Sequence, residues 1–196
     1  MTRQDDVNRP DAEGLAASAR KASGKGPPPV HLWDPPFCGD LDMRIARDGT
    51  WFYQGTPIGR EGLVRLFSSI IKKEGDDYFL VTPVEKVGIT VEDAPFVAID
   101  FRQTEEGLLF ETNVGDTALA GADHAIRIAR DGPEGEPSPY IHIRANLEAL
   151  IDRKSFYRLI DIGEHRDVEG TEWFGIASGD SFFQIMPSAE LEAASA

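Results

Sequence analysis

The chain has 196 residues, of which 41% are hydrophobic, enough apolar material for one large domain or two small ones. Its net charge of −14 falls mainly on residues 91–196, which hold eight basic and 21 acidic side chains, so we expect neither nucleic-acid polymers nor membranes as partners. The single cysteine, Cys38, excludes an internal disulfide framework, and the lack of a membrane-length or secretory apolar segment predicts a cytoplasmic protein.

Residues 1–35 are predicted to form a partly flexible N-terminal tail. A short helix is favoured over residues 11–22, because Asp11 can cap a run of helix-forming residues. Residues 23–29 are rich in Gly and Pro and predict a linker. Residues 31–37 contain Trp33 and Phe37, so we expect this segment to dock on the rest of the protein.

A repeat organises the remainder of the chain. The hexapeptide RIARDG occurs at residues 44–49 and again at residues 127–132. Residues 58–66 match residues 151–159 in the same order, with ten more residues between the matches in the second copy. We expect these extra residues to form a loop over residues 133–139, which are rich in Pro and Gly. The sequence therefore predicts two related lobes that arose by internal duplication.

Each copy is predicted to contain a β-hairpin, a helix and further strands. In the first copy, the turn Asp48–Gly49 joins two strands, and an apolar stripe predicts a helix from near Arg60 to Gly75. In the second copy, Asp152 caps a helix that ends near Gly163. The expected strands cover residues 43–47, 51–54, 56–58, 78–82, 84–91, 96–102, 108–112, 125–129, 140–144, 147–151, 172–176 and 181–185. This pattern predicts an α+β fold with mainly antiparallel sheet, divided into lobes at 36–90 and 91–187 and a C-terminal tail at 188–196.

Most sequence signatures of catalysis are missing. The glycines around Lys25 lack the spacing of a phosphate-binding loop, and Ser178 does not lie in a Gly-x-Ser-x-Gly motif. Residues 40–42 begin like a calcium loop, but Arg44 occupies the third ligand position. The four histidines are scattered along the chain. We therefore expect no cofactor and no metal.

Several polar residues remain candidates for a binding site. Arg60 and Arg153 occupy equivalent positions at the starts of the two predicted helices, where the helix dipole disfavours a cation unless it pairs with a carboxylate or captures an anion. An ion pair between the lobes and an anion site are both consistent with this placement. The other candidates lie in or beside polar turns, where turn formation alone is an alternative explanation: Lys86, Asp93, Thr112, Asn113 and Asp116.

Three segments resemble a bacterial family of unknown function, DUF1285. They are IARDGTWFYQGTPIGR at residues 45–60, YFLVTPVEK at 78–86 and VEDAPF at 91–96. The resemblance extends over residues 36–186. It implies a duplicated core of two α+β lobes, the second similar to a pleckstrin-homology barrel. It also implies a small-ligand site at the lobe interface, for a nucleotide-like molecule, and a role in signalling.

Three hypotheses about function follow. The first is a non-enzymatic ligand-binding or signal-transduction module, in which Arg60, Lys86 and Arg153 contact a small anion at the lobe interface. The second is a hydrolase or transferase that uses Glu85, Asp93 and Asp116 as acid–base groups. The third is an interaction scaffold, in which the acidic second lobe meets a basic protein partner or the chain forms a homodimer.

Overall fold

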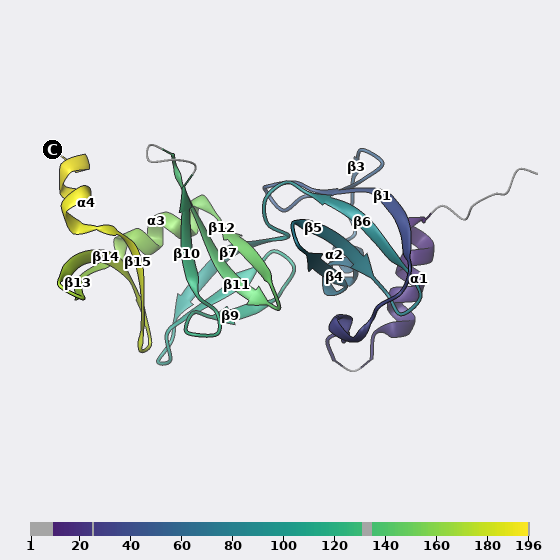
Figure 1. Ribbon diagram of the computed structural model, residues 1–196, viewed down its shortest axis with the longest axis horizontal. Helices are drawn as coiled ribbons and strands as arrows, with labels where there is room; N and C mark the ends of the chain where they lie inside the picture. Colours follow the sequence, from purple (N-terminus) through teal and green to yellow (C-terminus); the bar gives the residue numbers. More distant parts are fainter. Residues whose placement is uncertain (1–9, 25, 131–134, 196) are drawn as a thin grey trace, which may run out of the picture. The chain divides into compact units, whose positions relative to one another are not determined.

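The chain folds into two compact units, each of the α+β class (Figure 1). Unit 1 ends at Pro95 and unit 2 begins at Phe96. The computed structural model describes residues 10–24, 26–130 and 135–195. Within these ranges no helix has both the length and the hydropathy needed to cross a membrane.

Unit 1 begins with a packed helix, α1 (Ala12–Ala22). The Asp11 carboxylate accepts hydrogen bonds from the backbone amides of Glu13 and Gly14, both at 2.9 Å, as the sequence predicts for an N-cap. Leu15 is fully buried, and α1 contacts α2 (Glu61–Ser69). The short 3₁₀ helix η1 (Val30–Leu32) then lies beside the edge strand β4 (Ile71–Glu74). The predicted tail therefore includes a helix that contributes to the core of unit 1.

The sheet of unit 1 has six strands in the order β3-β2-β1-β6-β5-β4. Besides β4 they are β1 (Phe37–Ile45), β2 (Trp51–Tyr53), β3 (Thr56–Pro57), β5 (Asp77–Val81) and β6 (Lys86–Val91). The central pair, β1 and β6, is parallel, and all other neighbours are antiparallel. In the core the ring of Trp51 stacks on that of Phe67, with centroids 6.3 Å apart. The hairpin predicted around Asp48 and Gly49 is confirmed by the β1–β2 pairing.

The predicted helix from Arg60 to Gly75 is wrong at its C-terminal end. Helix α2 stops at Ser69, and the next residues form β4, where Ile71 pairs with Leu80. Gly75 has a φ of +61° and lies between β4 and β5, so it serves a strand turn rather than a helix end. A β-branched residue such as Ile71 fits a strand as well as a helical stripe, and its pairing with β5 decides for the strand.

Unit 2 contains a second six-stranded sheet, in the order β10-β11-β12-β7-β8-β9. Its strands are β7 (Phe96–Gln103), β8 (Leu108–Thr112), β9 (Thr117–Leu119), β10 (Ile126–Arg130), β11 (Pro137–Arg144) and β12 (Leu147–Ile151). Strands β12 and β7 are parallel. One sheet of the protein curls into a half-barrel, consistent with the expected pleckstrin-homology-like lobe (Figure 1). The predicted loop over residues 133–139 is too long, because β11 already begins at Pro137; residues 133 and 134 lie outside the described ranges.

A helix and a three-stranded sheet complete unit 2. Helix α3 (Arg153–Asp161) is capped by Asp152, whose carboxylate accepts a hydrogen bond from the Ser155 amide at 2.7 Å, as predicted. The small sheet follows with β13 (Glu164–Val168), β14 (Thr171–Ser178) and β15 (Ser181–Pro187), and helix α4 (Ser188–Ser195) comes last. The predicted strands at 172–176 and 181–185 are confirmed, whereas β9 and β13 were not predicted.

The duplication is visible in the order of the elements. Three strands, a helix and three strands form β1 to β6 with α2, and the same order recurs in β10 to β15 with α3. The first and last strands of the repeat, β1 and β6, pair in unit 1, and their counterparts β10 and β15 are in contact in unit 2. Strands β7 to β9 are the addition in unit 2, where they extend the sheet beyond β12.

Candidate functional site

The predicted site residues are divided between the two units. Unit 1 holds Arg60, Lys86 and Asp93, and unit 2 holds Thr112, Asn113, Asp116 and Arg153. Arg60 is the N-cap residue of α2, and its exposed side chain makes no hydrogen bond or ion pair with the described residues. Arg153 is the first residue of α3 and donates from Nε to the Tyr157 hydroxyl at 2.9 Å. This hydrogen bond raises the pKa of Arg153 above its ordinary value.

Three of the predicted residues meet in the turn between β8 and β9. Asn113 Oδ1 accepts a hydrogen bond from the Val97 amide at 3.0 Å, and Thr112 Oγ1 accepts one from the Asp116 amide at 3.0 Å. The Asp116 carboxylate pairs with Arg144. Thr112 is buried, whereas Asn113 and Asp116 are half-buried. The structure therefore uses these polar groups to hold the turn and to fasten it to β7 and β11.

The carboxylates proposed for acid–base catalysis do not share a site within one unit. The Glu85 amide donates to Thr82 Oγ1 at 3.2 Å in the turn between β5 and β6. Asp93 pairs with Arg47, its Oδ2 atom 3.1 Å from Nε, and its side chain is only 16% exposed. Asp116 belongs to unit 2. None of the three lines the pocket described next.

Unit 1 contains a pocket of about 310 Å³ on one face of its sheet, which we call the β1–β6 pocket. It is lined by Phe37, Asp40, Asp77, Tyr78, Phe79, Lys86, Gly88 and Ile89. Residues that pair across neighbouring strands point to the same face of a sheet. Gly88 of β6 pairs with Asp40 of β1 on one side and with Phe79 of β5 on the other, while Lys86 pairs with Phe37. Strand pairing therefore brings these five residues together.

Aromatic rings form one wall of the pocket. Phe37 and Phe79 meet edge to face, with ring centroids 6.1 Å apart, although the Phe37 side chain remains 55% exposed. The Lys86 ammonium lies 4.8 Å from the centre of the Phe79 ring and donates to Glu74 Oε2 at 2.9 Å. Lys72 is 3.1 Å from Glu74 Oε1. The hydrogen bonds from Lys86 and Lys72 hold the pKa of Glu74 below its ordinary value, and Glu74 in turn offsets the charge of Lys86.

The position of Asp40 depends on an irregular strand and on two glycines. The β1–β6 register shifts between Phe37 and Asp40 and again between Asp40 and Arg44, and Gly39 has a φ of +100°. Such irregularities turn a side chain away from the regular pleat. A Cβ atom on Gly88 would lie 2.1 Å from Asp40 Oδ1, so the carboxylate occupies the space that any other residue at position 88 would fill. The Asp40 carboxylate makes no hydrogen bond or ion pair with the described residues.

Of the predicted site residues, only Lys86 lines this pocket. The sequence suggests a role for Asp40 only as the first residue of an incomplete calcium loop, and no role for Gly88. Glycines inside β-strands, at positions 39 and 88, were the available signal, because a strand glycine often marks a bulge or a close approach. That signal does not reveal which carboxylate lies against which glycine, since parallel pairing of β1 with β6 brings together residues far apart in the chain.

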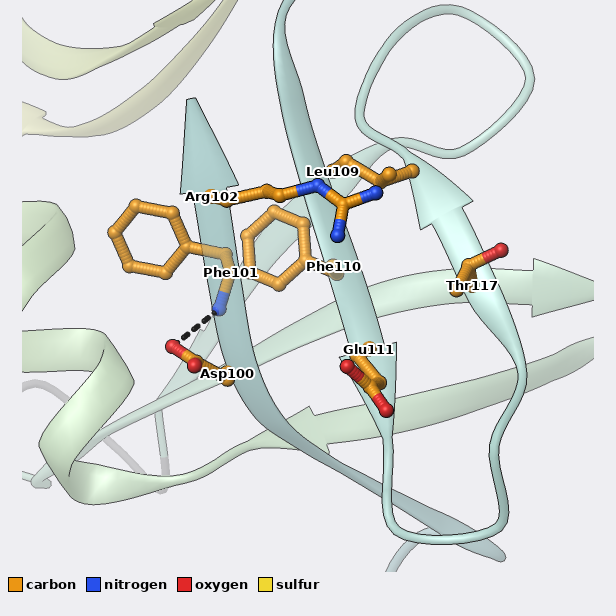
Figure 2. A pocket seen from close by; sticks show the side chains of 7 residues that line it. All are labelled: Asp100, Phe101, Arg102, Leu109, Phe110, Glu111 and Thr117. Carbon is orange, nitrogen blue, oxygen red and sulfur yellow. Dashed lines mark hydrogen bonds between the residues drawn. The ribbon is translucent and has the colours of Figure 1, made fainter. Parts of the chain in front are cut away.

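Unit 2 has a smaller hollow on the surface of β7, β8 and β9, shown in Figure 2. Its volume of about 70 Å³ is room for a few water molecules. Asp100 accepts a hydrogen bond from the Phe101 amide at 2.8 Å, drawn in Figure 2, and pairs with Arg158. The Arg158 hydrogen bond lowers the pKa of Asp100. A neighbouring depression of about 480 Å³ reaches Ile162 near the end of α3. Since Asp100 of the hollow and Arg158 of the depression pair with each other, the β1–β6 pocket is the stronger candidate for ligand binding.

In the part of the chain that the structure describes, no group of three or more His, Cys, Asp or Glu side chains is arranged to hold a metal ion.

Comparison with protein-family profiles identifies the family. The profile of the N-terminal domain of DUF1285, a family of unknown function, matches residues 28–94. The profile of the DUF1285 C-terminal domain matches residues 95–185. The chain belongs to the DUF1285 family.

Two solved DUF1285 structures resemble this fold. A protein from Silicibacter pomeroyi DSS-3, at 2.50 Å resolution, is 63% identical, with a TM-score of 0.81, and the match covers 91% of this chain and 98% of the other. A DUF1285 protein from Shewanella baltica OS155, at 1.40 Å, is 29% identical, with a TM-score of 0.51 over 62% of this chain and 91% of the other. No curated protein matches the sequence. These comparisons assign the family and support the two-domain fold.

Proposed function

We propose that this DUF1285 protein is a small-ligand-binding module and that the β1–β6 pocket of unit 1 is its binding site. The observation that carries the proposal is the Asp40 carboxylate, which lies over Gly88 without a partner among the described residues. The pocket volume of about 310 Å³ is at the lower end of the range for small-molecule sites. Apolar walls with a few placed polar groups are also typical of such sites.

The ligand that we propose is nucleotide-like, with its base in the pocket. Phe37 offers an exposed ring on which a base can stack, as aromatic side chains do in many nucleotide sites. Asp40 accepts hydrogen bonds from the ring edge, and the Lys86 ammonium lies beside the Phe79 ring. The anionic part of such a ligand would lie outside the pocket. Arg60, at the start of α2 in unit 1, remains a predicted contact for the anionic part, and Arg153, at the start of α3 in unit 2, remains a separate predicted anion contact.

Nucleoside monophosphates test the proposal directly. Purine and pyrimidine nucleotides would be titrated into the ¹⁵N-labelled protein, and we expect the amide signals of Phe79 and Gly88 to shift. At a concentration of 100 Kd the ligand should also stabilise the protein by about 2.7 kcal/mol. Phe37→Ala should weaken binding, whereas Val84→Ala, an exposed apolar residue outside the pocket, should not. If no nucleotide shifts the pocket signals or the melting temperature, the proposal is wrong.

A further inference from the structure

We infer that the β1–β6 pocket recognises a flat ring through two adjacent N–H groups, which the Asp40 carboxylate accepts side by side. The ligand class is therefore an amidine-like or guanine-like ring edge. This inference rests on the proposed function, because it concerns the same pocket. It goes further by specifying that the ligand edge in the pocket carries two adjacent N–H donors and that Asp40 accepts both.

The first argument is the hydrogen-bonding capacity of Asp40. An ionised carboxylate is only an acceptor, and its two oxygens suit a pair of parallel N–H donors. Within the described residues, no side chain or backbone donor satisfies the Asp40 oxygens. Because Gly88 has no side chain, it leaves room for Asp40 Oδ1 above β6, and the register shifts on either side of Asp40 place the carboxylate there. The pocket therefore presents an acceptor pair that only a ligand or water can satisfy.

The second argument is the charge of the pocket. Two acidic side chains, Asp40 and Asp77, line it together with a single basic one, Lys86. The Lys86 ammonium is already hydrogen-bonded to Glu74 at 2.9 Å. A phosphate or carboxylate in the pocket would meet Asp40 at close range and gain little from a lysine that is already paired. A donor-rich or cationic group is favoured instead.

The third argument is the shape of the wall. The Phe37 ring is 55% exposed and meets the Phe79 ring edge to face. A flat ring stacked on Phe37 would cover this apolar surface, and a delocalised cation would gain a cation–π contact with the aromatic wall. The Asp40 carboxylate occupies the space over Gly88, close to the edge of the Phe37 ring. The donor edge of the ring can then reach Asp40.

Matched small probes test the inference on the full-length protein. Benzamidine carries two N–H donor groups on a flat ring, and benzoate is an acceptor-only compound of the same shape. GMP and AMP form a second pair, because the guanine edge presents two adjacent donors and the adenine edge presents one donor beside an acceptor. We expect benzamidine and GMP to shift the amide signals of Phe79 and Gly88, and benzoate and AMP to bind at least about tenfold more weakly.

The variant Asp40→Asn should weaken benzamidine and GMP by about tenfold or more, because the amide replaces one acceptor by a donor. The control is Asp42→Asn, an exposed residue of the same strand that does not line the pocket. If Asp40→Asn does not fold, Gly88→Ala replaces it and should weaken both probes similarly, because the new Cβ displaces the carboxylate.

The outcomes separate this inference from the proposed function. If nucleotides bind in the pocket but benzoate binds as well as benzamidine, or Asp40→Asn binds GMP as the parent does, the donor-edge inference is wrong and the binding site stands. If neither the four probes nor any other nucleotide shifts pocket signals, both are wrong. Tighter binding of benzamidine and GMP that depends on Asp40 supports both.

Discussion

The guanidinium of Arg127 lies 4.3 Å from the centre of the Tyr140 ring, its direct partner across the β10–β11 ladder. Arg44 has the same relationship to Phe52 across β1 and β2, also at 4.3 Å. Each arginine is the first residue of the repeated hexapeptide. The two copies of the repeat therefore share a cross-strand cation–π contact as well as six identical residues.

Loss of either arginine should destabilise the protein modestly. Arg127 also donates two hydrogen bonds to Glu148, at 2.7 and 2.6 Å, and Arg44 pairs with Glu92. Because these contacts are partly exposed, we expect Arg44→Ala and Arg127→Ala each to lower the free energy of unfolding by about 1 kcal/mol. Urea denaturation measures the change. Arg65→Ala is the control, since that exposed side chain makes no contact of these kinds with the described residues; an equal loss there would contradict the prediction.

Gly88→Ala should change the pocket without unfolding unit 1. The added Cβ would lie 2.1 Å from Asp40 Oδ1, but a carboxylate at the end of a short side chain can rotate away. We expect the free energy of unfolding to change by less than about 1 kcal/mol, because alanine also fits a strand better than glycine. The amide signals of Gly39 and Asp40 should shift strongly in ¹H–¹⁵N spectra. Gly59→Ala, where the new Cβ meets nothing within 4 Å, should leave those signals in place.

Asn113→Ala should destabilise unit 2. The Asn113 side chain accepts the Val97 amide at 3.0 Å, and the part-buried amide would lose this acceptor. We expect a loss of about 1 to 2 kcal/mol in the free energy of unfolding. Asn113→Asp keeps the Oδ1 acceptor and should recover most of the loss. Equal stabilities for the Ala and Asp variants would show that this hydrogen bond does not hold the turn.

Glu74 should contribute to the acid sensitivity of unit 1. Its pKa in the folded protein is lowered from the ordinary value of 4.5, first by the Lys86 hydrogen bond and then by that of Lys72. A lowered carboxylate pKa stabilises the fold above the unfolded-state value, and this contribution is lost as the pH falls below 4.5 and through the folded-state pKa.

Denaturation is measured at a series of pH values. Below pH 4.5 the free energy of unfolding should fall less steeply with decreasing pH for Glu74→Gln than for the parent protein. The effect is modest because the Glu74 side chain is 38% exposed and solvent screens the pair. Glu85→Gln is the control, since the Glu85 side chain makes no hydrogen bond or ion pair with the described residues. The same dependence of the free energy of unfolding on pH in the parent and in Glu74→Gln would contradict the prediction.

Periodicity and turn chemistry predicted most elements of this fold, and the errors have local causes. The capping residues Asp11 and Asp152 begin helices because their carboxylates bond to nearby backbone amides, which is visible in sequence. The end of α2 was misplaced because Ile70 and Ile71 continue a helical stripe, while the strand that begins at Ile71 depends on pairing with β5. Strand β13 was missed because its residues, Glu164–Val168, are mostly charged and exposed.

The candidate site was harder to predict than the fold. Asn113 and Asp116 drew attention as polar residues, but the structure uses them in local hydrogen bonds and ion pairs. The position of Asp40 in the pocket depends on a strand irregularity and on Gly88, which is 48 positions away along the chain. Such a pairing depends on sheet topology, which hydrophobic patterning does not encode.

The parallel pairing of β1 with β6 has a consequence for how unit 1 is made. The first and last strands of this sheet form its centre, so β3-β2-β1 and β5-β4 are joined only through β6. A nascent chain that has left the ribosome only as far as Glu85 would present two separate pieces of sheet with unpaired edge strands. Completion of unit 1 during synthesis therefore waits for the segment Lys86–Val91, and the same six residues bring Gly88 under Asp40. The β1–β6 pocket and the folded sheet should thus form in one step.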